Sequence, residues 1–83
     1  MKFKAEINIM PLKTLLDPQG KAVTGSMSNI GLSEIENVRI GKHITLEINT
    51  ESREQAEEKT EEACRKLLAN QIMESYEFTV TEL

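Results

Sequence analysis

Few residues of this chain have the type and spacing that catalysis requires. His43 is the single histidine and Cys64 the single cysteine, and no Cys, Ser or carboxylate is spaced along the chain as a fixed partner for His43. One thiol cannot form an internal disulfide or a Cys-x-x-Cys metal or redox site. Cys64 falls on an apolar helical stripe, where it is expected to pack in the core. The sequence therefore predicts no catalytic residue and no metal ligand.

The carboxylates and the glycines also lack the spacing of a catalytic or phosphate-binding site. Acid–base catalysis needs two titratable groups in different environments, one of them desolvated, whereas the largest group of glutamates here, six of 13, occupies exposed positions of a helical pattern between residues 51 and 66. The glycines lack both the G-x-G-x-x-G spacing and the Lys-Ser/Thr ending of a phosphate-binding loop. No cofactor-binding residue is predicted.

The length, net charge and apolar content of the chain limit the classes of partner that it can bind. The chain has 83 residues, which suits a single domain over 1–83 with a thin core. Its formal net charge of -4 disfavours nucleic acid and anionic membrane surfaces, because both attract clustered Lys and Arg. No apolar run approaches the roughly 20 residues that cross a bilayer, and the N-terminus lacks the apolar stretch of a secretory signal. We expect a cytoplasmic protein that binds neither membrane nor nucleic acid.

Six elements are predicted to position these residues. Apolar and polar residues alternate in several segments with the period of two that is typical of strands. Asp17 followed by Pro18 indicates a helix start, and Ser52 with Gln55 forms a capping box. Gly41-Lys42 between alternating runs indicates a hairpin turn. The predicted order is strand 2–9, helix 17–30, strand 37–40, strand 43–49, helix 52–70 and strand 76–81.

This order predicts an α+β fold of the ferredoxin-like type, β-α-β-β-α-β, with a four-stranded antiparallel sheet and two helices on one face. Strands 2–9 and 43–49 should lie in the centre, and strands 37–40 and 76–81 at the edges. An RNA-recognition domain of this topology would need aromatic side chains on the open face, where this chain has charged and polar residues. The unpaired backbone groups of the edge strands would permit strand-to-strand dimerisation.

Four stretches in one order give the chain a family resemblance. They are the alternating strand 2–9, Leu-Asp-Pro-Gln-Gly-Lys-Ala-Val at 16–23, Val-Arg-Ile-Gly-Lys-His-Ile at 38–44 and Lys-Leu-Leu-Ala-Asn at 66–70. With these stretches the chain resembles the small subunit of phosphoribosylformylglycinamidine synthase over nearly its whole length. The stretch at 16–23 is the most distinctive of them.

The resemblance implies a non-catalytic subunit of a complex in purine biosynthesis. A large synthetase subunit would use ATP and Mg to activate the formamide oxygen of formylglycinamide ribonucleotide, and a glutaminase subunit would release the ammonia that replaces this oxygen. The small subunit would hold these two enzymes together, as a homodimer or a dimer of dimers, and would bind no cofactor itself.

Four residues are candidates for contacts with a partner subunit. Gln19 and Lys21 lie near the start of the predicted helix 17–30, and Arg39 and Lys42 flank the predicted hairpin tip, where positive charge would suit a carboxylate-bearing surface. The alternative is that all four simply belong to a helix face and a turn. A second class of function also stays open, namely a regulatory domain of the same fold that binds a small metabolite where edge strands pair.

Overall fold

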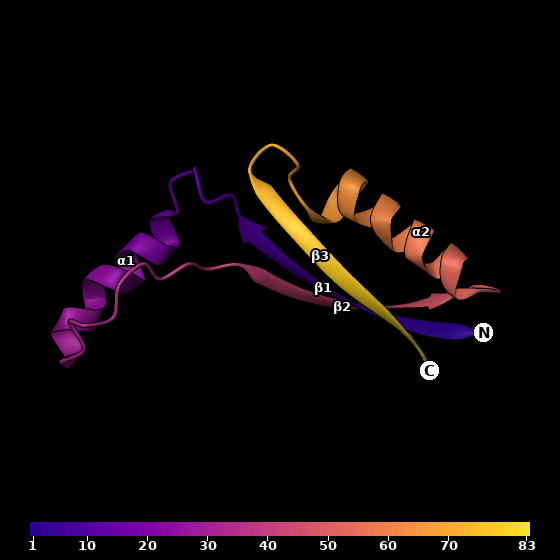
Figure 1. Cartoon of the computed structure of the whole chain (residues 1–83), viewed down its shortest axis with the longest axis horizontal. Coiled ribbons are helices and arrows are strands. Elements are labelled where there is room, and N and C mark those ends of the chain that lie inside the picture. Colours follow the sequence, from indigo (N-terminus) through magenta and orange to yellow (C-terminus); the bar gives the residue numbers. More distant parts are fainter.

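The chain forms a three-stranded antiparallel sheet with two helices (Figure 1). A computed structural model describes all of residues 1–83. No helix in it is both long enough and apolar enough to span a membrane. The elements are β1 (Lys2–Pro11), α1 (Pro18–Met27), β2 (Lys42–Asn49), α2 (Arg53–Ala63) and β3 (Glu74–Glu82), with a 3₁₀ turn at Ser28–Ile30 after α1 and a π-helical turn at Cys64–Leu68 after α2.

The sheet has β1 in the centre, in the order β2-β1-β3. Apolar residues of β1 alternate with polar ones, and the register sets Ile7 between Ile44 of β2 and Phe78 of β3. The apolar side chains of all three strands therefore share one face, as the period of two predicts. Three of the four predicted strands are confirmed: those at 2–9, 43–49 and 76–81.

Helix α2 lies on the apolar face of the sheet, against β3 and β1 (Figure 1). The hydroxyl of Ser52 accepts a hydrogen bond from the N–H of Gln55 at 3.2 Å, which confirms the predicted helix start. Cys64 is fully buried, as predicted. Its burial raises the pKa of its thiol, and the nearby Glu61 carboxylate raises this pKa further. The two core clusters are Phe3, Ala5, Ala56 and Val80, and Ile7, Ile9, Cys64 and Ala69.

The predicted strand 37–40 is not formed, so the prediction of a four-stranded sheet is wrong. This segment is extended, but its N–H groups bond to side chains of the α1 region: Val38 donates to Thr24 Oγ1 and Ile40 to Asp17 Oδ2, each at 3.0 Å. The hairpin predicted at Gly41 is also wrong, because the chain runs directly from this segment into β2. As a result β2 is an edge strand, not a central one.

Helix α1 does not cover the sheet, so the prediction of both helices on one face is wrong as well. It projects beyond one end of the sheet (Figure 1), within a segment that we call the arm, residues 12–41. The molecule extends 51 × 26 × 14 Å, with a radius of gyration of 16.5 Å. A compact chain of this length would have a radius of about 12 Å. The arm therefore contributes little to the core and leaves much of its own surface exposed.

Candidate functional site

The most distinctive sequence stretches, 16–23 and 38–44, meet where the arm leaves the sheet, and Asp17 joins them. Its Oδ1 accepts from the N–H of Gly20, which caps α1, and its Oδ2 accepts from the N–H of Ile40, both at 3.0 Å. Oδ2 also lies 3.5 Å from Nε of Arg39. The two N–H groups, and then Arg39, hold the pKa of Asp17 below its usual value of 3.8. An ionised Asp17 thus fixes α1 to the segment that leads into β2.

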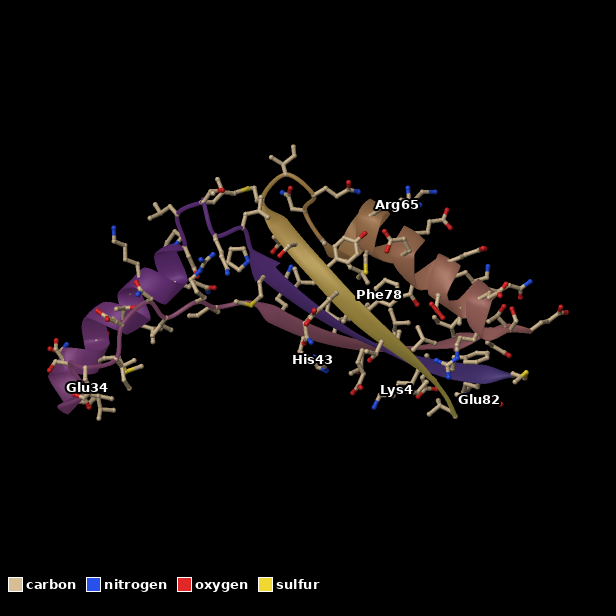
Figure 2. All side chains as sticks on the ribbon, in the orientation of Figure 1. Lys4, Glu34, His43, Arg65, Phe78 and Glu82 are labelled. Carbon is tan, nitrogen blue, oxygen red and sulfur yellow. The ribbon has the colours of Figure 1, made fainter.

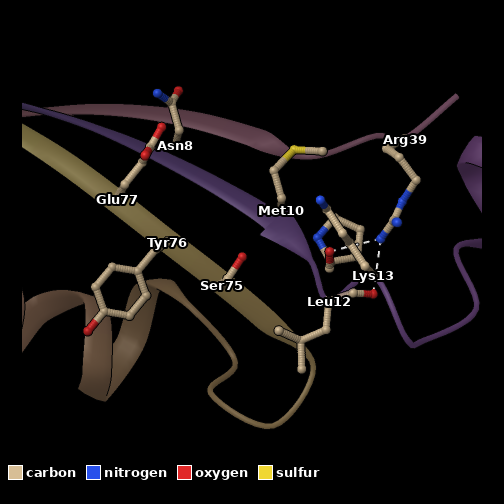
Figure 3. A pocket seen from close by; sticks show the side chains of 9 residues that line it. Asn8, Met10, Leu12, Lys13, Arg39, Ser75, Tyr76 and Glu77 are labelled. Carbon is tan, nitrogen blue, oxygen red and sulfur yellow. Dashed lines mark hydrogen bonds between the residues drawn. The ribbon is translucent and has the colours of Figure 1, made fainter.

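Arg39 also stabilises the base of the arm, through bonds to the end of β1. Its Nη2 donates to the carbonyl oxygens of Pro11 and Leu12, at 2.9 and 3.0 Å (Figure 3). Together with the ion pair to Asp17, these bonds connect the end of β1, the start of α1 and the approach to β2. The structure therefore gives Arg39 a role within its own chain, and its contact with a partner stays a prediction.

Two glycines of these stretches, Gly20 and Gly41, allow backbone segments to pack closely against each other at the base of the arm. A Cβ atom on Gly20 would collide with the carbonyl oxygen of Val38, and one on Gly41 would collide with the carbonyl oxygen of Ile9 and the sulfur of Met10. A larger residue at Gly41 would push the arm away from the sheet. A larger residue at Gly20 would push α1 away from residues 37–40, the return segment in which the chain runs back toward β2. Both glycines are thus explained by packing at the base of the arm.

The other three candidate contacts lie in different surroundings. Gln19 and Lys21 are exposed on α1, and Lys42 lies 3.6 Å from the Glu74 carboxylate at the start of β3. Lys21 and Arg39 line one shallow hollow. The structure sets these two candidates at one hollow, which neither Gln19 nor Lys42 lines.

A second open hollow of about 680 Å³ lies between Arg39 and the ends of β1 and β3 (Figure 3). Lys13 and Arg39 approach it from the arm, while Tyr76 points away from them, toward α2. The Tyr76 hydroxyl donates to Glu61 at 2.6 Å, and this bond, with burial, raises the pKa of the phenol. The tyrosine thus stays protonated and ties β3 to α2. The charged side chains that line the hollow are Lys13, Arg39 and Glu77, so it offers both signs of charge.

His43 lies on the opposite, polar face of the sheet. Its Nδ1 is 2.7 Å from Oδ1 of Asn8, and the pair is exposed. No group of three His, Cys, Asp or Glu side chains is arranged to hold a metal ion. That this chain binds no metal and no cofactor stays a prediction.

Leu15 and Leu16 are not among the contact residues predicted from the sequence, although Leu16 begins the distinctive stretch 16–23. They are 37% and 68% exposed and line the hollow that also holds Lys21. The available signal was two adjacent leucines outside any periodic pattern, directly before a helix cap. Exposed apolar side chains beside a cation are typical of a protein-contact surface.

Comparison with known proteins gives the chain a family. The family model described as PurS, phosphoribosylformylglycinamidine (FGAM) synthase, matches residues 4–82. The phosphoribosylformylglycinamidine synthase subunit PurS of Bacillus subtilis (strain 168) is 35% identical over 81 residues, which cover 98% of this chain and 95% of that one. The corresponding subunit of Methanocaldococcus jannaschii is 31% identical over 81 residues, 98% of each chain.

Solved structures agree with this match. PurS of Thermus thermophilus superposes with a TM-score of 0.85 at 37% identity, covering 100% of this chain and 99% of that one. A chain in the structure of PurLQS from Thermotoga maritima superposes with a TM-score of 0.88 at 30% identity, covering 98% and 99%. The resemblance read from the sequence is confirmed: this chain belongs to the PurS family of phosphoribosylformylglycinamidine synthase subunits.

Proposed function

We propose that the chain acts as a non-catalytic subunit of phosphoribosylformylglycinamidine synthase in purine biosynthesis. It would bridge the ATP-dependent synthetase subunit and the glutaminase subunit and support the transfer of ammonia between them. The observation that carries the proposal is the family match over residues 4–82, reinforced by the similarity to a chain of PurLQS. ATP and Mg would act in the synthetase subunit, not in this chain.

The shape of the molecule supports a bridging role. Contact with two enzymes at once requires separate surfaces, and this chain offers a sheet with one helix at one end and a projecting arm at the other (Figure 1). The bonds of Asp17 and Arg39 hold the base of the arm in one geometry. A braced arm keeps two partners at a fixed separation, which is what the transfer of a reactive intermediate needs.

Self-association as a homodimer or dimer of dimers, in the cytoplasm, belongs to the same proposal. Both β2 and β3 are edge strands with a free backbone edge, and such edges favour pairing. The strand predicted at 37–40 would form only if this extended segment pairs with another chain in the assembly.

The direct test mixes the chain with candidate synthetase and glutaminase subunits, Mg-ADP and glutamine. We expect one assembly that contains all three proteins, and glutamine-dependent amidine formation that requires this chain. Omission of the chain is the control. Equal glutamine-dependent activity with and without it would contradict the proposal, and a ligand-induced rise in melting temperature of the isolated chain would favour the metabolite-binding alternative.

A further inference from the structure

The hollow of about 680 Å³ beside Arg39 is lined both by the arm and by the polar face of the sheet. This face is turned away from α2: His43 projects from it, on the opposite side from Arg65 at the end of the helix (Figure 2). The volume of the hollow falls within the range of small-molecule sites, about 300–1,000 Å³. Residues of the central strand β1 line it, so it does not lie at a free strand edge.

Opposite charges line the two ends of this hollow. Lys13 and Arg39 lie at the end beside the arm, and Glu77 lies at the other end, on the sheet (Figure 3). The register sets Glu77 opposite Asn8. Asn8 precedes Pro11, whose carbonyl oxygen accepts from Nη2 of Arg39, by three positions. At about 3.4 Å per residue, the two ends are therefore about 10 Å apart along the strand.

The charges at the two ends are free to bind a ligand. Neither Lys13 nor Glu77 forms an ion pair within the chain. Arg39 is paired with Asp17 at 3.5 Å, so Lys13 carries the free positive charge at its end. A ligand gains a partner at both ends when it is anionic at one end and donates N–H hydrogen bonds at the other.

The middle of the hollow is neutral. Ser75 and Met10 are opposite each other in the register, and both lie between the charged ends (Figure 3). Pro11 and Leu12 add apolar lining on the side of the arm. An aliphatic chain between two polar ends fits this lining, because small-molecule sites combine apolar walls with a few placed polar groups.

We propose that the hollow binds a free amino acid whose side chain ends in N–H donors. Its α-carboxylate contacts Lys13, its α-ammonium donates to the Ser75 hydroxyl, and the end of its side chain donates to the Glu77 carboxylate. After a hydrogen bond of about 2.8 Å at each end, roughly 4–5 Å remain for the ligand, which is the length of an amino acid such as glutamine.

Among the reactants of the proposed synthase, glutamine has this form. Glutamate, which the hydrolysis of glutamine yields, does not, because its second carboxylate would face the carboxylate of Glu77. The hollow therefore distinguishes glutamine from glutamate. The choice of glutamine rests on the proposed function, whereas the pattern of charge belongs to the hollow itself.

The test titrates the full chain with L-glutamine and with L-glutamate, and follows the amide signals of Ser75 and Glu77 by NMR. Wild type should bind glutamine about tenfold or more tightly than glutamate. Glu77→Gln should remove most of this preference, and Glu77→Lys should reverse it, because a cation then faces the end of the side chain. Lys13→Gln should weaken both ligands alike, about two- to fivefold, because both have the α-carboxylate.

Lys59→Gln on α2 and Glu82→Gln at the end of β3 are matched controls, since both side chains are exposed and neither lines the hollow. Both variants should bind as wild type does. The proposal is overturned if glutamine gives no saturable shift, if wild type binds both amino acids equally, or if Glu77→Lys keeps the wild-type preference.

These outcomes are independent of the bridging role. Glutamine binding does not by itself decide between that role and the regulatory alternative, whereas the assay in which the chain is omitted does. A chain that binds glutamine but can be omitted without loss of activity would keep the site and lose the bridging role. A chain that is required for activity but does not bind glutamine would keep the bridging role and lose the site.

Discussion

Asp17 combines the cap of α1 with a link to the segment that returns from the arm. Its two carboxylate oxygens accept from separate N–H groups, those of Gly20 and Ile40. An asparagine in its place keeps one accepting oxygen but loses the other together with the negative charge. Since Asn is itself a good helix cap, the loss falls on the contacts to Ile40 and Arg39. We expect Asp17→Asn to lower the melting temperature at pH 7 by several degrees, measured by circular dichroism.

The same carboxyl gives stability a pH dependence of known sign. The pKa of Asp17 in the folded chain lies below 3.8, chiefly because of the N–H groups of Gly20 and Ile40. Its contribution is therefore complete above the unfolded-state pKa and is lost as the pH falls through the folded-state pKa. The stability advantage of wild type over Asp17→Asn, measured by urea unfolding, should shrink as the pH falls below about 5. A gap that does not change with pH would show that the charge is not responsible.

Gly20 and Gly25 belong to the same helix but have opposite surroundings. A Cβ atom at Gly20 would collide with the Val38 carbonyl, whereas nothing lies within 4 Å of one at Gly25. Gly25→Ala should raise the free energy of unfolding by about 0.5–1 kcal/mol, because Ala is the better helix former. Gly20→Ala should lower it by about 1–3 kcal/mol, because the backbone must shift. Denaturant unfolding at one protein concentration compares them, and equal effects would contradict the close packing at Gly20.

At the scale of elements, Thr24 adds a second link, beside that of Asp17, between α1 and the segment 37–40 in which the arm returns to β2. Its hydroxyl accepts from the N–H of Val38 at 3.0 Å and donates to the carbonyl of Gly20 at 2.8 Å. Thr24→Val keeps the shape and leaves the Val38 N–H without a partner, at a cost of about 1–3 kcal/mol. We expect faster hydrogen exchange of the Val38 amide, with little change for amides of β1.

Ser26→Ala is the matched control, because the Ser26 hydroxyl bonds only to the carbonyl of Ala22 on the exposed side of α1. It should leave the exchange of the Val38 amide unchanged. If Thr24→Val also leaves that exchange unchanged, the return segment is held by the Asp17 and Arg39 bonds alone.

Local sequence patterns were sufficient for β1, β2 and β3 and for the starts of both helices, because alternation and capping act over a few residues. They failed for residues 37–40, whose alternation is that of a strand. There the N–H groups bond to side chains of Asp17 and Thr24, more than a dozen residues away. A local pattern cannot show which distant group a backbone donor will find.

The candidate site was predictable in part, for a similar reason. Lys21 and Arg39 stood out by charge within distinctive stretches, and the structure sets both at one hollow. Leu15 and Leu16 carry no charge, and the hollows that they line exist only where segments distant in sequence meet at the base of the arm. Exposure is a property of the whole fold, so apolar contact residues in loops escape a reading of the sequence.

At the scale of the molecule, the buried core lies almost wholly outside the arm. Gly20 is the only one of the ten buried residues that belongs to residues 12–41. β1 and β2 are antiparallel neighbours whose pairing extends to Ile9 opposite Lys42, so the arm is an insertion between two adjacent strands. The body of sheet and α2 supplies the stability, and the arm supplies surface for contacts.

Removal of the arm separates these two contributions. In a chain whose residues 12–41 are replaced by a short Asn-Gly turn, which suits antiparallel neighbours, both core clusters remain complete. We expect this body to unfold cooperatively, with the strand signal of the full chain in circular dichroism. It should fail to support glutamine-dependent activity, because the surface that the arm offers to a partner is gone. A folded body that still dimerises would place self-association on the edges of β2 and β3, and a body that does not fold would show that the bonds of Asp17 and Arg39 stabilise the sheet as well as the arm.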